Sequence, residues 1–456
     1  MKKLRWVTAT ILCLLMIAAT AAPVLADGPN PYGVTVQVGE KEGVIRAYNE
    51  SYAGNIFLSL RDLSRALDGS AAQFRVDYEV SGTDGECWRV SLGQASAPTA
   101  AEAGGKIPDS APVTQALNLR RNRLFVDGGE RRYYSYCSED KDLYLSLADV
   151  QLMLDLTVER LEDGRLCLDV EKPFLPDLYA LRDEDYFGAF NAVLVGDADT
   201  GEILFSHNRA WRYPIASISK LMSYLLLAEA VERGEASWQD SVKLSQKAAA
   251  LSWSADGIVA LPTGGEYPLE ELAQAMMLAS SNEAALAIAE HLAGSEEAFV
   301  ARMNERASEL GLNSASFYTP HGLPSYSAGA LPGKRQNAMS AADLFSLCAT
   351  VLKEQPELTE MTKLQFIHLP KQGYSTANSN PLVFNMPGVN GLKTGSTNRA
   401  GYCLAASLPL TVGEETHTLV AVVLGAESAE LRGQGTEILL RYASAYYLEK
   451  GFSKTA

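Results

Sequence analysis

Apolar and polar positions alternate in short runs over the first 170 residues, and longer apolar runs with helical spacing follow beyond residue 200. Segments such as VTVQVG, CWRVSLG and RLCLDV have the period of two that predicts half-buried strands. NIFLSLRDLSRALD at 55–68 and DLYLSLADVQLMLD at 142–155 repeat one pattern 87 residues apart. Each copy predicts a short strand, a serine N-cap and an amphipathic helix. Residues 31–172 are therefore expected to form one α+β module with two similar halves.

The second part of the chain, over residues 180–450, combines strand patterns with long apolar helices. NAVLVGDADTGEILFSHN predicts two strands joined by a turn, and KLMSYLLLAEAV predicts a buried helix that Gly234 closes. LEELAQAMMLASSNEAALAIAEHLAG predicts two helices interrupted near Ser280. The β-rich runs GLKTGSTNRAGYCLAASL and HTLVAVVLGAES precede a terminal helix, TEILLRYASAYYLEKGF. Strands that bracket a helical block predict an α/β (α+β) fold, with an antiparallel sheet and helices packed against it.

The N-terminus reads MKKLRWVTATILCLLMIAATAAPVLADGPN, a basic start followed by an apolar run and a small-residue cleavage site. This order predicts a secretory signal peptide over residues 1–26, cut after Ala26. An uncleaved membrane anchor is the alternative, since the apolar run nearly spans a bilayer. In both cases the rest of the chain is expected outside the cytoplasmic membrane, on its cell-wall side.

Composition narrows the possible partners. The 456 residues carry a net charge of −16, which argues against nucleic acid because phosphate binding needs a basic face. Cys13 leaves with the signal peptide, and the five remaining cysteines lack the spacing of a zinc site or a disulfide framework. One or two disulfides, or buried free thiols, are both compatible with that number. All five histidines lie beyond residue 200. The first 200 residues therefore cannot hold a histidine-based metal site. The chemistry that the motifs below imply needs neither a metal nor an organic cofactor.

Ser217-Ile218-Ser219-Lys220 opens the apolar helix with two hydroxyls and a cation. On a helix, residues three apart share a face, so Ser217 and Lys220 can touch while Ser219 cannot join them. A serine becomes nucleophilic when a base takes its proton, and a lysine can be that base when burial and neighbouring cations lower its pKa. The structural alternative is a serine N-cap followed by a lysine that extends toward solvent.

Two further motifs are weak when each is taken alone. SSN at residues 280–282 places hydroxyl and amide groups in an apolar helical stretch, where a core would prefer neither. Its structural alternative is a helix break capped by Asn282. KTG at residues 393–395 sets a cation beside a hydroxyl, before a glycine that lets another backbone or a ligand approach closely. Its alternative is an exposed edge strand that runs into a turn.

The order and spacing of the three motifs make them specific together. S-x-x-K is followed by S-x-N 63 residues later and by K-T-G 113 residues after that. This set is the signature of penicillin-binding proteins and class A β-lactamases. The chain resembles the low-molecular-mass penicillin-binding proteins, the serine D-alanyl-D-alanine carboxypeptidases (peptidase S11-like), over about residues 185–450. AVLVGDADTGEILFSHN, LGLNSASFYTPHGL and GVNGLKTGSTNRAGYCLAAS carry the likeness beyond the motifs.

The resemblance implies a role for each motif residue. Ser217 would be the acylated nucleophile and Lys220 its general base, while Ser280 and Asn282 would relay protons and hold the substrate amide. Lys393 and Thr394 would bind the terminal carboxylate of the peptide, and backbone amides of Ser217 and Ser396 would form the oxyanion hole. The substrate-binding set that the resemblance implies is Lys393, Thr394, Gly395 and Ser396.

The reaction implied is removal of the terminal D-alanine from peptidoglycan stem peptides, with β-lactams as inhibitors that acylate Ser217. Endopeptidase or transpeptidase activity could use the same residues. Ser281 replaces the aspartate of S-D-N, which argues against a class A β-lactamase. ELGLN at residues 309–313 matches the deacylating glutamate motif of that class. The segment around it resembles the carboxypeptidases instead, so Glu309 is expected on a helix surface. A non-catalytic surface protein that only grips wall peptide is the alternative from another class.

The N-terminal module resembles the copper amine oxidase N-terminal-like domain, through residues 55–67 and the following AAQFRVDYEVSG. No copper is expected, because no histidine is available there. Two roles stay open for the module: binding a cell-wall or surface partner, or serving as a spacer without a ligand.

Overall fold

The computed structural model describes residues 29–50, 56–82, 84–96, 114–174, 178, 186–251, 261, 263–325, 335–369 and 374–454. The expected signal peptide, residues 1–26, lies outside the described residues. Within the described ranges, no helix combines the length and the apolar character needed to cross a membrane.

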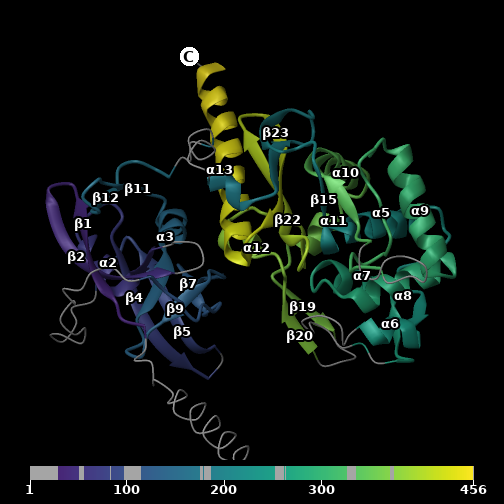
Figure 1. The fold of residues 1–456 in the computed structure, drawn as a ribbon, viewed down its shortest axis with the longest axis horizontal. Coiled ribbons are helices and arrows are strands. Elements are labelled where there is room, and N and C mark those ends of the chain that lie inside the picture. The colour runs from purple at the N-terminus through teal and green to yellow at the C-terminus, as the bar shows by residue number, and fades with distance from the viewer. Residues whose placement is uncertain are drawn as a thin grey trace, which may run out of the picture.

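The first part of the chain forms two sheets with two short helices (Figure 1). Its elements are β1 (Tyr32–Val38), β2 (Lys41–Glu50), β3 (Ile56–Ser59), α2 (Leu60–Ala66), β4 (Phe74–Ser81), β5 (Gly85–Leu92), β6 (Thr114–Gln115), β7 (Leu124–Val126), β8 (Gly129–Arg131), β9 (Ser135–Cys137), β10 (Leu143–Ser146), α3 (Leu147–Leu154), β11 (Thr157–Arg160) and β12 (Leu166–Asp169). One sheet has the order β11-β12-β1-β2-β3-β10-β9, with β6 paired to β2, and the other has the order β4-β5-β7-β8.

The repeated pattern of the sequence forms the repeated unit that it predicts. Ser59 ends β3 and its Oγ accepts a hydrogen bond from Asp62 N at 3.0 Å, which caps α2. Ser146 ends β10 and caps α3 in the same way, with Asp149 N at 3.1 Å. The two strands pair antiparallel, with Leu58 opposite Leu145. The two strand–helix units therefore lie side by side in one sheet.

The second part surrounds a five-stranded sheet. Its elements are η1 (Tyr186–Ala189), β13 (Ala192–Asp197), β14 (Ile203–His207), β15 (Arg212–Pro214), η2 (Ala216–Ser219), α5 (Lys220–Glu232), β16 (Ser241–Lys243), α6 (Gln246–Ala250), β17 (Glu266–Pro268), α7 (Leu269–Met277), α8 (Asn282–Ala293), α9 (Glu296–Glu309), β18 (Ala338–Ser340), α10 (Ala341–Glu354), α11 (Leu358–Thr362), β19 (Phe366–Leu369), β20 (Tyr374–Ala377), α12 (Leu382–Asn385), β21 (Gly391–Thr397), β22 (Gly401–Val412), β23 (Glu415–Ala426) and α13 (Ala429–Lys454).

The five-stranded sheet has the order β14-β13-β23-β22-β21, and every pair is antiparallel, as the sequence predicts. Neighbouring residues of β13 face two different cores. Leu194 packs with α5, α8 and α10, whereas Val193 and Val195 pack with α13. Helices therefore cover both faces of the sheet (Figure 1). The last helix begins at Ala429, seven residues before the predicted start at Thr436.

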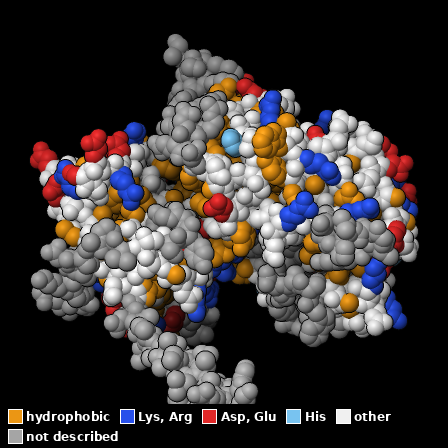
Figure 2. Space-filling view, viewed as in Figure 1, with side chains coloured by type: hydrophobic (Ala, Val, Ile, Leu, Met, Phe, Trp, Pro, Cys, Tyr) orange, Lys and Arg blue, Asp and Glu red, His pale blue; other side chains and the backbone are white. Residues whose placement is uncertain are grey.

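The two parts contact each other through α3 and the end of β8 on one side, and α12 and α13 on the other (Figure 1). Arg131 Nη1 donates to Phe384 O at 2.8 Å, and Arg441 Nη2 donates to Leu152 O at 2.8 Å. On the face drawn in Figure 2, hydrophobic side chains gather between the two parts, and Lys and Arg side chains lie over the second part. The first part is therefore docked on α12 and α13 of the second part.

Candidate active site

The S-x-x-K segment forms the entry to a buried helix. Ser217 lies in the short 3₁₀ turn η2, and α5 begins at Lys220, whose side chain is fully buried. Lys220 Nζ lies 2.9 Å from Ser217 Oγ, while Ser219 Oγ donates to Ala216 O at 2.6 Å. The predicted contact of Ser217 with Lys220 and the exclusion of Ser219 are confirmed. The alternative of a capping serine and a lysine that extends toward solvent is wrong.

The surroundings of Lys220 suit a neutral amine. Besides Ser217 Oγ, its Nζ contacts Asn282 Oδ1 at 2.8 Å and His321 O at 2.8 Å. Both of these oxygens accept hydrogen bonds only, so they take the two protons of a neutral amine. Ser217 Oγ accepts from Lys220 Nζ when the amine is charged, and its hydroxyl can donate to the lone pair when the amine is neutral. The contact therefore allows a proton to pass between Ser217 and Lys220.

The S-x-N motif breaks the helical stretch between α7 and α8. Ser280 has a positive φ of 61°, an uncommon conformation for a residue other than glycine, and it lies between the end of α7 at Met277 and the start of α8 at Asn282. Ser281 caps α8, because its Oγ accepts from Ala284 N at 3.0 Å, so the predicted break is confirmed and a cap by Asn282 is wrong. The Asn282 side chain therefore does not cap α8, and its Oδ1 contacts Lys220 Nζ instead. Within the described part of the chain, the Ser280 hydroxyl has no hydrogen bond.

The K-T-G motif lies on β21, the strand at the edge of the sheet. Lys393 and Thr394 are 1% and 5% exposed, so the alternative of an exposed strand is wrong for these two side chains. Lys393 Nζ donates to Thr394 O at 3.1 Å, and Thr394 Oγ1 donates to Ser379 Oγ at 2.7 Å. Ser396, the next predicted residue along the strand, is exposed.

Gly395 brings this strand against the nucleophile. A Cβ atom at Gly395 would lie 2.9 Å from Ser217 N and 2.8 Å from Ile215 O. Such distances are too short for a side chain, so the strand can pass this close only with glycine here. The predicted close approach of another backbone is confirmed, and it places the amides of β21 next to that of Ser217.

Like charges surround the lysines of the site. Burial and the charge of Arg432 lower the pKa of Lys393 to about 7. Burial, together with the charge of Lys393, holds the pKa of Lys220 well below its usual value. Both causes are those that the sequence predicts for a lysine that acts as a base. An incoming carboxylate would compensate the charge of Lys393.

Arg432 is the main site residue that the sequence interpretation misses. It lies on the first turns of α13, is 5% exposed and stacks on the Tyr402 ring at 6.0 Å from its centroid. Its guanidinium has no hydrogen bond or ion pair with any described residue, and its Nε is buried. A buried cation without a partner indicates an anion site. The one signal in the sequence is an arginine in an otherwise weakly charged segment, LRGQGT.

The side chains of Glu309 and His321 both lie away from the Ser217 hydroxyl. Glu309 lies exposed at the end of α9 and pairs with Arg306 at 3.2 Å, as expected for a surface residue. The ring of His321 contacts Glu296 at 3.6 Å and Leu323 N at 3.1 Å, so it is no partner of Ser217. The five cysteines beyond residue 26 are free thiols. The residues that the structure describes hold no group of three His, Cys, Asp or Glu side chains that could bind a metal.

Comparison with known proteins shows to which family the chain belongs. Residues 183–428 match the Peptidase S11 family, described as D-alanyl-D-alanine carboxypeptidase. The chain belongs to the D-alanyl-D-alanine carboxypeptidase family. D-alanyl-D-alanine carboxypeptidase DacF of Bacillus subtilis is 33% identical over 282 residues, which cover 60% of this chain and 68% of DacF. DacD of Escherichia coli is 31% identical over 54% of this chain and 61% of its own length.

Solved structures of similar fold include penicillin-binding proteins. The peptidoglycan synthesis regulatory factor PBP3 of Streptococcus pneumoniae has a TM-score of 0.52 at 29% identity, over 56% of this chain and 74% of its own. Penicillin binding protein 5 of Haemophilus influenzae has a TM-score of 0.51 at 26% identity, over 56% and 71%. Membership of the carboxypeptidase family confirms the predicted resemblance for the second part of the chain. The likeness of residues 31–172 to the copper amine oxidase N-terminal-like domain stays a prediction, since the family match begins at residue 183.

Proposed function

We propose that this chain is a serine-type carboxypeptidase that removes the terminal D-alanine of peptidoglycan stem peptides through an acyl-enzyme on Ser217. The observation that carries the proposal is the contact of Ser217 Oγ with Lys220 Nζ at 2.9 Å, at a lysine whose pKa burial and the charge of Lys393 hold well below its usual value. A lysine within hydrogen-bond reach and with a lowered pKa has the two properties that a general base needs.

Acylation would begin when Lys220 Nζ takes the hydroxyl proton of Ser217. Oγ then attacks the carbonyl carbon of the penultimate D-alanine, and the amides of Ser217 and Ser396 would stabilise the oxyanion. The intermediate collapses when the C–N bond breaks, and the departing amine of D-alanine receives a proton from Lys220, directly or through Ser280. Water then attacks the ester, Lys220 again takes a proton, and Ser217 leaves as the alcohol.

Substrate binding is assigned to Lys393, Thr394 and Arg432. Lys393 and Arg432 are buried cations, and Thr394 follows Lys393 in the chain and has a hydroxyl. A terminal carboxylate would compensate both charges and accept hydrogen bonds. A β-lactam with a carboxylate on its ring system offers the same anion beside a strained amide. We therefore expect β-lactams to acylate Ser217.

The proposal is tested by release of D-alanine from a peptide that ends in D-Ala-D-Ala. Wild type and Ser219→Ala should release D-alanine at similar rates, and Ser217→Ala should release none. No release by wild type, together with retained binding of the peptide, would favour the non-catalytic wall-binding alternative. Release of D-alanine only when a second peptide supplies an amine would indicate transpeptidation. Cleavage of cross-linked dimers alone would indicate an endopeptidase.

We also infer that the chain is exported and acts on the cell-wall side of the cytoplasmic membrane, because residues 1–26 have the order of a signal peptide. Expression in a bacterial host should give a mature N-terminus at Asp27. A chain that keeps Met1 and sediments with membranes would instead indicate an anchor. The N-terminal module would position the enzyme at the wall, or serve as a spacer.

A further inference from the structure

The N-terminal module is docked on the segments that present the substrate-binding cations. Arg131 Nη1 donates to Phe384 O at 2.8 Å, and Arg132 N donates to Asn385 Oδ1 at 2.6 Å. Both acceptors belong to α12, which ends six residues before β21. The Arg132 guanidinium also lies over the Phe384 ring, 4.8 Å from its centroid. The module therefore contacts the helix that precedes the strand carrying Lys393.

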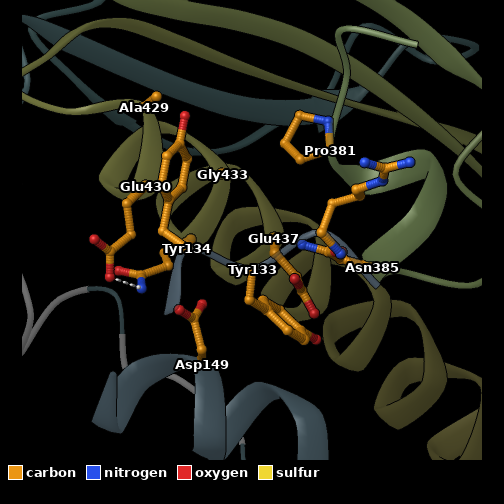
Figure 3. A pocket seen from close by; sticks show the side chains of 11 residues that line it. Tyr133, Tyr134, Asp149, Pro381, Asn385, Ala429, Glu430, Gly433 and Glu437 are labelled. Atoms are coloured by element: carbon orange, nitrogen blue, oxygen red, sulfur yellow. Dashed lines mark hydrogen bonds between the residues drawn. The ribbon is translucent and has the colours of Figure 1, made fainter. Parts of the chain in front are cut away.

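The module also contacts the first turns of α13, where Arg432 lies. Gln434 Nε2 donates to Ser146 Oγ at 2.9 Å, and Tyr134 lines a small cavity together with Glu430 and Gly433. Figure 3 shows the ring of Tyr134 beside the first turn of α13, next to Glu430 and Ala429. The cavity of about 20 Å³ has room for one water at most, so the two surfaces fit closely. The module thus also contacts the turns of α13 that carry Arg432.

Arg121 of the module adds a third cation at this place. It stacks on Tyr134, 5.0 Å from the ring centroid, and its Nε is buried without a hydrogen-bond partner among the described residues. Burial and, as the second cause, the charge of the nearby Arg121 lower the pKa of Arg432 to about 10. Two neighbouring guanidinium groups, both without an ion pair in the described chain, repel each other until an anion binds.

We propose that Arg121 is a positioning and specificity-determining residue, by which the N-terminal module strengthens recognition of the substrate carboxylate through Arg432. This inference rests on the proposed function. It makes the module part of the carboxypeptidase site, in addition to any partner that the module binds. The positive charge of Arg121 attracts ligands that carry a carboxylate. It gives no such attraction to ligands without that negative charge.

The test compares a penicillin, which has a free carboxylate, with its methyl ester, which does not. Second-order rate constants for acylation are measured by intact mass on the full chain. Arg121→Gln is expected to slow acylation by the penicillin about three- to tenfold, and to change acylation by the ester less than twofold. For a D-Ala-D-Ala peptide, KM should rise by a similar factor while kcat is nearly unchanged.

Matched variants separate charge from structure. Arg120→Gln changes the net charge equally at the neighbouring, exposed position and should behave as wild type. Arg121→Lys keeps the charge and should recover most of the lost rate. Arg432→Gln should slow the penicillin more than Arg121→Gln does.

Each outcome decides one question. Equal rates for Arg121→Gln and wild type with the penicillin would overturn the inference and leave the proposed function standing. Equal slowing of the penicillin and the ester, without recovery by Arg121→Lys, would show a structural role and also overturn it. A wild type that neither compound acylates would instead refute the proposed function.

Discussion

Ser217 and Lys220 could be predicted from the sequence because their contact is local. A spacing of three residues and an apolar helix behind them fix both the geometry and the burial. Arg432 could not be found in this way, because only the packing of α13 on the sheet brings it near Lys393. Ser280 could be located at the helix break, but its positive φ could not be predicted from the sequence.

Replacing the base tests its role at this scale. Lys220→Met should reduce kcat for D-alanine release by about 10²- to 10⁴-fold, the usual range for loss of a general base. Methionine has a similar length and no charge to bury, so the melting temperature should not fall by more than a few degrees. Steady-state kinetics and thermal unfolding of the same preparation check both parts. Activity within tenfold of wild type would assign the base elsewhere.

The pKa of Lys393 provides a second test. Burial is the largest cause of the low pKa of Lys393, and the charge of Arg432 is the second. Arg432→Gln should therefore raise the pKa of Lys393 above about 7. In the proposed function a protonated Lys393 binds the carboxylate, so the alkaline fall of kcat/KM should move to higher pH in the variant, although the maximal value should be lower. The pH profile of kcat/KM measures the midpoint directly. A midpoint that stays or moves to lower pH would contradict the assignment.

At the scale of elements, local patterns predicted most units and missed those that tertiary packing decides. The strand–cap–helix repeats at Ser59 and Ser146 follow from residues close in sequence, and they were predicted. The start of α13 was placed too late because Gly433 and Gly435 lower helix propensity. Packing requires small residues there, since a Cβ at Gly435 would lie 2.8 Å from the Phe190 ring.

The close approach of β21 to η2 is testable by one methyl group. Gly395→Ala places a Cβ within 2.9 Å of Ser217 N, so the strand must move away from the nucleophile. We expect kcat/KM to fall at least tenfold and the free energy of unfolding to fall by about 1–3 kcal/mol. Gly43→Ala is the control, because a Cβ there meets nothing within 4 Å. Full activity of Gly395→Ala would show that the strand tolerates displacement.

At the scale of the whole molecule, the sequence separated the two parts but could not predict how they dock. The interface joins α3 and the β8 end to α12 and α13, and these contacts span up to 289 positions in the chain. Patterns of local spacing hold no information on such pairs. Many strands and helices of each part were therefore predictable, while the contacts between the two parts were not.

The same interface buries acidic side chains, which makes docking sensitive to pH. Burial and the nearby Glu437 raise the pKa of Asp149 to about 7, and burial with Asp149 raises that of Glu430 to about 8. Figure 3 shows Asp149, Glu430 and Glu437 around the cavity. The pKa of Glu437 is also raised by burial, and Glu50 adds a further negative charge near Glu430.

Carboxyls with raised pKa hold protons in the folded state that the unfolded chain has already lost. Stability should therefore fall as the pH rises through about 7–8. We expect the melting temperature to drop by roughly 3 °C or more between pH 6 and pH 9, and Asp149→Asn with Glu430→Gln to remove most of that drop. Thermal unfolding at both pH values measures it. An equal pH dependence in the double variant would contradict the assignment.

The most direct test of the central claim is the mass of the mature protein after incubation with a penicillin. The account predicts one covalent adduct per chain, located by peptide mapping on Ser217, present in Ser219→Ala and absent in Ser217→Ala. An adduct on any other residue, or an unmodified wild type, would contradict a Ser217 nucleophile activated by Lys220.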